Sequence, residues 1–164
     1  ALLLVTGEGP AMESLRQQAT RLGLADSVRF LGYLDRASAL PDCYAAADLF
    51  VFASRTETQG LVLLEALAAG TPVVALSAMG TADILAHAPG CIAPPDDPQA
   101  FGEVVGKLLA DPAACLELAA QARKTASLWS DEAMAGRLAQ LYRQTLAKRE
   151  KSGTLAVQTS TAGS

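Results

Sequence analysis

Glu57 and Glu65 are the residues of this sequence whose type and spacing could do chemistry. They lie eight positions apart in the segment ETQGLVLLE, and Glu65 is the one charged residue between Leu61 and Leu76. An ionised carboxylate in an apolar helix is costly unless hydrogen-bond donors meet it. Glu65 therefore requires a specific partner, which is either a basic side chain of this protein or the hydroxyl groups of a ligand.

The elements that would position these carboxylates follow from the alternation of short apolar runs with longer helical segments. The runs are continuously apolar, which is typical of buried parallel strands, and they cover residues 2–5, 28–31, 49–52, 73–76 and, as a fifth candidate, 91–93. The helical segments between them cover residues 12–22, 39–47, 61–69 and 81–86. Gly23, Gly70 and Gly90 stand where helix C-termini favour a left-handed residue. This order predicts an α/β fold, a Rossmann-like doubly wound parallel sheet.

The C-terminal third is predicted to be helical. Three helical stretches, residues 101–110, 113–127 and 131–149, are expected to pack on the sheet, which gives one domain over residues 1–150. From residue 151 to 164 the chain is rich in Gly, Ser, Thr and Gln, with too few apolar side chains to offset the entropy of ordering it. We expect this segment to be a disordered tail.

The composition excludes several classes of function. The chain has 164 residues, with 13 basic and 17 acidic residues and a net charge of −4. This balance offers no electrostatic footprint for nucleic acid. The three cysteines are widely spaced in apolar surroundings, which favours reduced core thiols and a cytoplasmic protein over disulfides or a metal site. No apolar run approaches the roughly 18 residues that a membrane span requires.

Ligands of a parallel sheet bind beyond the carboxyl ends of its strands, so the residues that follow each strand are the candidate site. The richest of these segments is 54–60, because it leads directly into the helix at Leu61. We expect the backbone amides of Gly60, Leu61 and Val62 to be free to bind a diphosphate. Glu65, about one turn further along, could then reach the diol of an attached ribose, while Glu57 faces the group at the other end of the diphosphate.

The segment 52–75, FASRTETQGLVLLEALAAGTPVVA, closely resembles the donor-binding motif of retaining GT-B glycosyltransferases of the GT4-like group. Segments 5–10, 28–32, 44–48 and 134–146 are similar to other elements of that family, so the resemblance covers residues 1–148. It implies that this chain is the C-terminal half of a GT-B fold and binds a nucleotide-diphospho-sugar donor. The family's first strand and helix of this domain, and the N-terminal domain that holds the acceptor, would be missing.

The resemblance also implies a role for each residue of the motif. Glu57 is the expected catalytic residue and would contact the hydroxyls of the donor sugar, and Glu65 would bind the ribose hydroxyls. The remaining donor contacts would come from the backbones of Thr58, Gln59 and Gly60 on the sugar and its phosphate, from the amides of Leu61 and Val62 on the diphosphate, and from Tyr33 near the base.

Gly7 and Arg55 each leave two interpretations open. Gly7 lies in a Gly-Glu-Gly segment that resembles part of a nucleotide-binding loop or forms only a tight turn. Arg55 is either a phosphate ligand or one partner of a buried ion pair.

The implied reaction is transfer of a hexose from a UDP- or GDP-linked donor with retention at the anomeric carbon, without a cofactor or a bound metal. Catalysis would consist mainly of electrostatic stabilisation of the departing diphosphate. The acceptor, a sugar, lipid or glycan, would be held by the missing N-terminal domain, which would also carry any association with a membrane. The family's phosphate-binding Arg and Lys precede this chain, so we expect the fragment alone to be inactive.

Two alternatives from other classes remain. A sugar-nucleotide epimerase-like GT-B enzyme would need acid and base side chains in the crevice, where Glu57 and Glu8 are the plausible candidates. A non-catalytic nucleotide-binding or scaffold domain would keep the fold without the reaction. The intact pair of glutamates argues against a scaffold, because a buried Glu65 without a ligand would be costly to keep.

Overall fold

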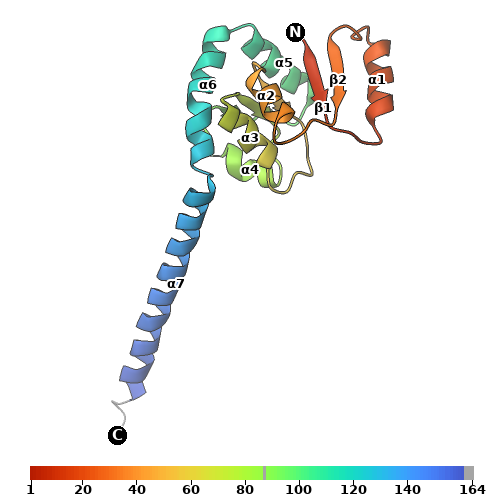
Figure 1. The fold of residues 1–164 in the computed structure, drawn as a ribbon. Helices are drawn as coiled ribbons and strands as arrows, with labels where there is room; N and C mark the ends of the chain where they lie inside the picture. Colours follow the sequence, from red (N-terminus) through yellow and green to blue (C-terminus); the bar gives the residue numbers. More distant parts are fainter. Residues whose placement is uncertain (87, 161–164) are drawn as a thin grey trace. The chain divides into compact units, whose positions relative to one another are not determined.

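A computed structural model of the chain describes residues 1–86 and 88–160, with side chains described as far as residue 149. Figure 1 shows the strands and helices in chain order. The strands are β1 (Leu3–Thr6), β2 (Val28–Gly32), β3 (Phe50–Phe52), β4 (Val73–Ala75) and β5 (Cys91–Ile92). The helices are α1 (Met12–Arg21), α2 (Ala39–Ala45), α3 (Leu61–Ala69), α4 (Gly80–Leu85), α5 (Pro98–Leu109), α6 (Pro112–Ser127) and α7 (Asp131–Ser160). Residues 1–125 form one compact unit, and α7 belongs to a second unit.

All strand pairings are parallel, as the alternation of strands and helices predicts. Strand β1 pairs with β2 in one sheet, with Leu3 opposite Val28, and β3, β4 and β5 follow in that order in another. The sequence predicted a single sheet, whereas the structure has two separate sheets. Among the described residues, β1 and β3 each pair on one edge only.

The two sheets differ in burial. Strand β4 is fully buried at Val73, Val74 and Ala75, as expected for the middle strand of a covered parallel sheet. Strand β1 is not, because Leu3 and Leu4 are 45% and 38% exposed. The prediction that all four apolar runs are buried strands is therefore right for β4 and wrong for β1 and for β2, in which Leu31 is 42% exposed, while β3 is half-buried.

Helix α3 is the apolar centre of the unit. Leu63, Ala66 and Leu67 are completely buried, and the helix packs on β3, β4 and α2. It begins and ends where the sequence predicts, since Gly60 and Gly70 both have positive φ angles at its ends. Such φ angles are costly for residues with a Cβ atom. The helix that carries Glu65 is therefore fixed at both ends by its sequence.

Helices α5 and α6 pack on this unit, as predicted for the C-terminal third. Asp97 caps α5 by accepting a hydrogen bond from the amide of Ala100, and Pro98 occupies the first turn. In α6, Thr125 donates to the carbonyl of Pro89, and Arg123 donates to the carbonyl of Ala69 at the C-terminus of α3 at 3.0 Å. These two hydrogen bonds attach α6 to the C-terminus of α3 and to the loop before β5.

The last helix extends further than the sequence suggested. We predicted a helix over 131–149 and a disordered tail from residue 151, whereas α7 continues to Ser160; residues 161–164 of that predicted tail lie outside the described residues. Extending an existing helix costs much less than nucleating one. The run of weak helix formers after residue 150 therefore does not end α7 in this structure. The domain boundary at residue 150 stays a prediction.

Substitution of the buried centre of α3 tests this packing. Leu63→Ala should lower the free energy of unfolding by about 2–5 kcal/mol, because Leu63 is 0% exposed and its removal leaves a cavity. Leu116→Ala, at a leucine that is 71% exposed on α6, is the matched control and should change it by less than about 0.5 kcal/mol. Chemical denaturation measures both. Equal losses for the two variants would contradict the assigned core.

Candidate donor-binding site

The carboxylate of Glu57 folds back over the turn that precedes α3. Its Oε1 atom accepts hydrogen bonds from the backbone amides of Gln59 at 2.9 Å and Gly60 at 3.0 Å. These hydrogen bonds, first that of Gln59 and then that of Gly60, hold the pKa of Glu57 below its ordinary value. We expected a free amide at Gly60, and this expectation is wrong because Glu57 itself satisfies that amide. The Oε2 atom of Glu57 has no partner among the described residues.

The turn is fixed by a close backbone approach from the loop after β4. Gly60 has a φ angle of 72°, and a Cβ atom there would lie 2.6 Å from Cδ1 of Ile84. A Cβ atom on Gly80 would lie 2.1 Å from the carbonyl oxygen of Thr58. The amide of Gly80 donates to the carbonyl of Glu57 at 3.0 Å. Glycine is thus required at both positions for the loops after β3 and β4 to meet.

The first turn of α3 leaves two backbone donors available. Leu63 and Leu64 donate to the carbonyl of Gly60, whereas the amides of Leu61 and Val62 donate to no described residue. Unpaired amides at a helix N-terminus carry a partial positive charge and bind anions. Two of the three predicted amides are therefore unpaired at the N-terminus of α3.

Glu65 lies one turn further along α3 and is held by two side chains. Its Oε1 atom forms an ion pair with Arg36, and its Oε2 atom accepts a hydrogen bond from the hydroxyl of Tyr44 at 3.2 Å. Of the two partners that the sequence left open for Glu65, a basic side chain or a ligand, the structure shows the basic side chain. Neither Arg36 nor Tyr44 was predicted as a partner, although Arg36 is a basic residue in the loop after the second strand, a signal that could have identified it.

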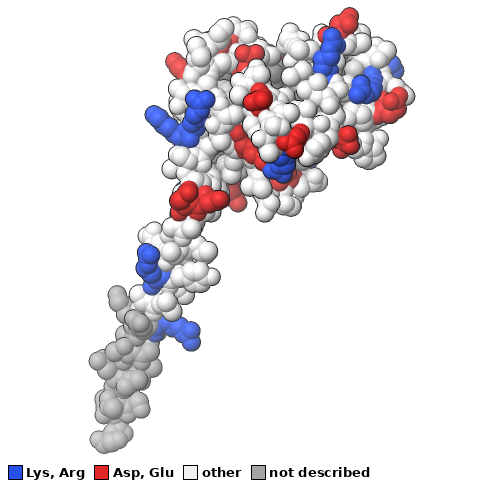
Figure 2. All heavy atoms as spheres, viewed as in Figure 1, with Lys and Arg blue, Asp and Glu red and all other residues white. Residues whose placement is uncertain are grey.

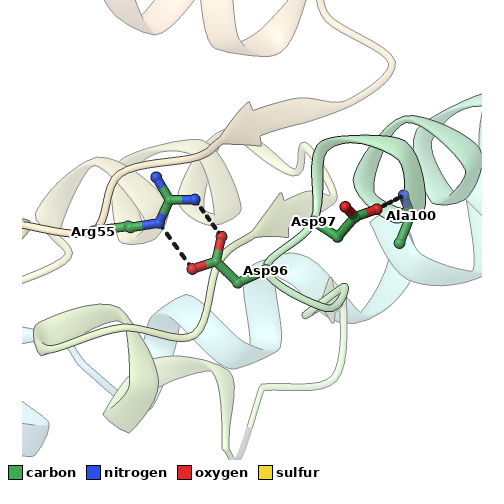
Figure 3. Close-up of polar contacts among 4 residues, drawn as sticks. All are labelled: Arg55, Asp96, Asp97 and Ala100. Atoms are coloured by element: carbon green, nitrogen blue, oxygen red, sulfur yellow. Dashed lines mark hydrogen bonds and ion pairs between the residues drawn. The ribbon is translucent and has the colours of Figure 1, made fainter.

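Arg55 belongs to a bidentate ion pair with Asp96, drawn in Figure 3. Its Nε and Nη2 atoms donate to the two carboxylate oxygens at 2.8 and 2.6 Å. The hydrogen bonds and charge of Asp96 raise the pKa of Arg55, and the hydrogen bonds of Arg55 lower that of Asp96. Of the two interpretations of Arg55, the structure shows the ion pair, but both side chains are more than half exposed (63% and 55%), so the pair is not buried.

Tyr33 and Gly7 lie on the β1 and β2 side of the unit. Tyr33 is 67% exposed directly after β2. Gly7 has a φ angle of 98° and donates its amide to the carbonyl of Gly32 at 2.7 Å, which continues the pairing of β1 with β2. The two interpretations of Gly7 stay open. A hollow lined by Val5 to Met12 and Leu15 includes Gly7, but neither Glu57 nor Glu65 lines it.

Acidic and basic side chains are scattered over the face in Figure 2, without a broad basic patch there. In the part of the chain that the structure describes, no group of three His, Cys, Asp or Glu side chains could hold a metal ion. Over the same residues, no helix is both long and apolar enough to span a membrane.

The sequence matches the model of a known protein family. The family described as "Glycosyl transferases group 1" matches residues 1–111, which is more than half of the sequence. The chain belongs to this family. The predicted resemblance is confirmed, and with it the glycosyltransferase class of transferases.

Two curated relatives illustrate the match of this group 1 glycosyltransferase. The D-inositol 3-phosphate glycosyltransferase of Thermobispora bispora is 38% identical over 143 residues, covering 86% of this chain and 33% of the relative. The GDP-mannose-dependent alpha-(1-6)-phosphatidylinositol monomannoside mannosyltransferase of Mycobacterium tuberculosis is 32% identical over 152 residues, covering 87% of this chain and 39% of the relative. The chain thus spans little more than a third of such proteins.

A solved structure gives the fold. The crystal structure of Anabaena HepE in complex with UDP and glucose superposes with a TM-score of 0.70 at 28% identity, covering 90% of this chain and 40% of that one. The predicted fold class, the Rossmann-like C-terminal half of a GT-B glycosyltransferase, is confirmed. Glycosyltransferases of this group use nucleotide sugars as substrates without a cofactor.

The backbone contact at Gly80 provides a direct test of the site's construction. Gly80→Ala should displace the 57–60 turn and lower the free energy of unfolding by at least about 1–3 kcal/mol, because its Cβ atom would lie 2.1 Å from the Thr58 carbonyl oxygen. Gly106→Ala, where a Cβ atom in α5 meets nothing within 4 Å, should instead stabilise the chain by up to about 1 kcal/mol. Thermal unfolding distinguishes them, and a neutral Gly80→Ala would contradict the contact.

Proposed function

We propose that this chain binds the nucleotide-diphospho-sugar donor of a hexosyltransferase that acts with retention at the anomeric carbon. The observation that carries the proposal is the pair of unpaired amides, Leu61 and Val62, at the N-terminus of the helix that also holds Glu65. An oriented helix N-terminus favours a diphosphate both in the bound donor and, more strongly, as the leaving group gains charge.

The two glutamates divide the remaining recognition between them. Glu65, one helical turn from the amides, accepts hydrogen bonds from the ribose diol. Glu57 already uses Oε1 to order the turn, so its Oε2 atom is the one that can accept from the hydroxyls of the donor sugar. The backbone of Thr58 and Gln59 completes this contact, and Tyr33, being exposed, is available to the base. Thus the proposed site combines an anion-binding helix end with acceptors for a polyhydroxylated ligand.

The donor is proposed to be UDP- or GDP-linked. The HepE structure contains UDP and glucose, and the mycobacterial relative is named for GDP-mannose. Arg55 does not contribute a free cation in this proposal, because both oxygens of Asp96 engage it. The acceptor would be bound by a further domain of the kind that the longer relatives contain, and any contact with a membrane would be made there. Within such a protein, this chain would act on the cytoplasmic side.

The open strand edges support a further domain element. Strands β1, β2, β3 and β5 each pair on one side only among the described residues, and the leucines of β1 are partly exposed. Since an unpaired edge leaves a row of backbone donors and acceptors unsatisfied, we propose that an upstream strand inserts between β1 and β3 and joins the two sheets. The domain over residues 1–150 would then contain one continuous parallel sheet.

Hydrogen exchange tests the inserted strand. Amides of β1 should exchange more slowly in a longer protein that includes the upstream segment than in this 164-residue chain, because the strand would gain a second hydrogen-bonded neighbour. Amides of β4, which already has neighbours on both sides, are the internal control. Unchanged protection of β1 would contradict the proposal.

Glu65→Gln tests the proposed function itself. The variant keeps the size of the side chain but loses its charge, and it should weaken binding of UDP or GDP by about tenfold, the order expected for hydrogen bonds to a charged group. Ligand-observed saturation-transfer NMR measures the ribose signals of each nucleotide with both proteins. Asp96→Asn, which affects the ion pair with Arg55, is the matched control. The proposal fails if no nucleotide gives a ribose signal with the unmodified chain.

A further inference from the structure

Glu65 has two partners of different character. Tyr44, on α2, donates to Oε2 at 3.2 Å and is 8% exposed, whereas Arg36, in the loop before α2, pairs with Oε1 and has a side chain that is 64% exposed. The Glu65 side chain is 30% exposed. One carboxylate oxygen is therefore held from the protein interior, and the other is held by a side chain that faces solvent.

Tyr44 is fixed independently of Glu65. Its ring meets the ring of Phe50 edge to face, with centroids 5.3 Å apart, and its backbone carbonyl accepts a hydrogen bond from the hydroxyl of Thr71 at 2.6 Å. Burial, followed by the charge and hydrogen bond of Glu65, raises the pKa of Tyr44 to about 12. The hydroxyl is therefore protonated near neutral pH, and its proton is available to Glu65 from a rigid position.

Arg36 is held less firmly. An ion pair between exposed side chains typically contributes about 0–1 kcal/mol, because water screens the charges and two long side chains lose freedom. An ionised carboxylate offers about four lone-pair sites. With Tyr44 on Oε2, the Oε1 atom can accept from vicinal hydroxyls at little cost once Arg36 moves away. A diol is the ligand group that matches a carboxylate with one oxygen held by Tyr44 and one oxygen whose partner, Arg36, can be exchanged.

We propose that Tyr44 is a positioning residue, which orients the Glu65 carboxylate for the ribose diol, and that Arg36 occupies Oε1 only until the donor displaces it. This inference rests on the proposed function, since it assumes that Glu65 reads ribose. It assigns to α2 a part in donor recognition that is carried out through Glu65 and without direct contact with the nucleotide.

The experiment compares each nucleotide with its analogue that lacks the diol. Calorimetric titration gives the affinities of UDP and GDP and of their 2′,3′-dideoxy forms, and the ratio within a pair measures ribose recognition. Tyr44→Phe should reduce this ratio by about tenfold, as expected for one lost hydrogen bond to a charged group, while binding of the dideoxy form changes little. Thr71→Val, which loosens the anchoring of α2 without touching Glu65, is the structural control.

Arg36→Ala is a second variant. The protein should still fold with this substitution, because the Arg36 side chain is exposed. This variant should leave the ratio unchanged or increase it. The inference is overturned if Tyr44→Phe weakens both members of a pair equally, or if Arg36→Ala reduces the ratio. An unmodified chain that binds neither nucleotide, or that does not distinguish ribose from its dideoxy form, overturns the proposed function and this inference together.

Discussion

The backbone contact between Gly80 and the Thr58 peptide is the constraint on which the candidate site depends. It brings the loops after β3 and β4 together, and no side chain larger than hydrogen fits at Gly80 without moving that peptide. The contact fixes the turn in which Glu57 accepts hydrogen bonds from the amides of Gln59 and Gly60. The 57–60 turn then determines where α3 begins and therefore which amides remain unpaired. The unpaired amides are thus positioned by backbone contacts.

Both glutamates of the motif are satisfied by the protein itself when no ligand is present. Glu57 accepts hydrogen bonds from two amides of the turn, and Glu65 pairs with the charge of Arg36 and accepts a hydrogen bond from Tyr44. Neither carboxylate is left as a buried, uncompensated charge, which would be costly. A ligand that binds Glu65 at Oε1 must replace the ion pair with Arg36, whereas a ligand at Oε2 of Glu57 displaces no partner. For this reason the more exposed partner, Arg36, is the one that can exchange.

Local signals in the sequence predicted most of the fold and part of the site. Helix α3 was predicted at its observed bounds from its apolar run and from Gly70 at its C-terminus, and the alternation of apolar runs predicted parallel strands. The split into two sheets and the exposure of β1 were not predictable. An apolar run does not indicate which strands pair with it or which elements cover it. The partners of Glu65 were missed for a similar reason. Arg36 lies 29 positions away, and only the packing of α2 on α3 brings it near. The roles assigned to Glu57, Tyr33 and the motif backbone stay predictions.

Donor binding, as proposed, depends on the N-terminus of α3 binding the diphosphate. Its most direct test is a titration of the isotopically labelled chain with UDP and with GDP, followed through the backbone amide resonances. The amide resonances of Leu61 and Val62 should shift most, followed by those of Gln59 and Gly60. Shifts concentrated in the Gly7 to Met12 loop, with Leu61 and Val62 unaffected, would contradict this proposal.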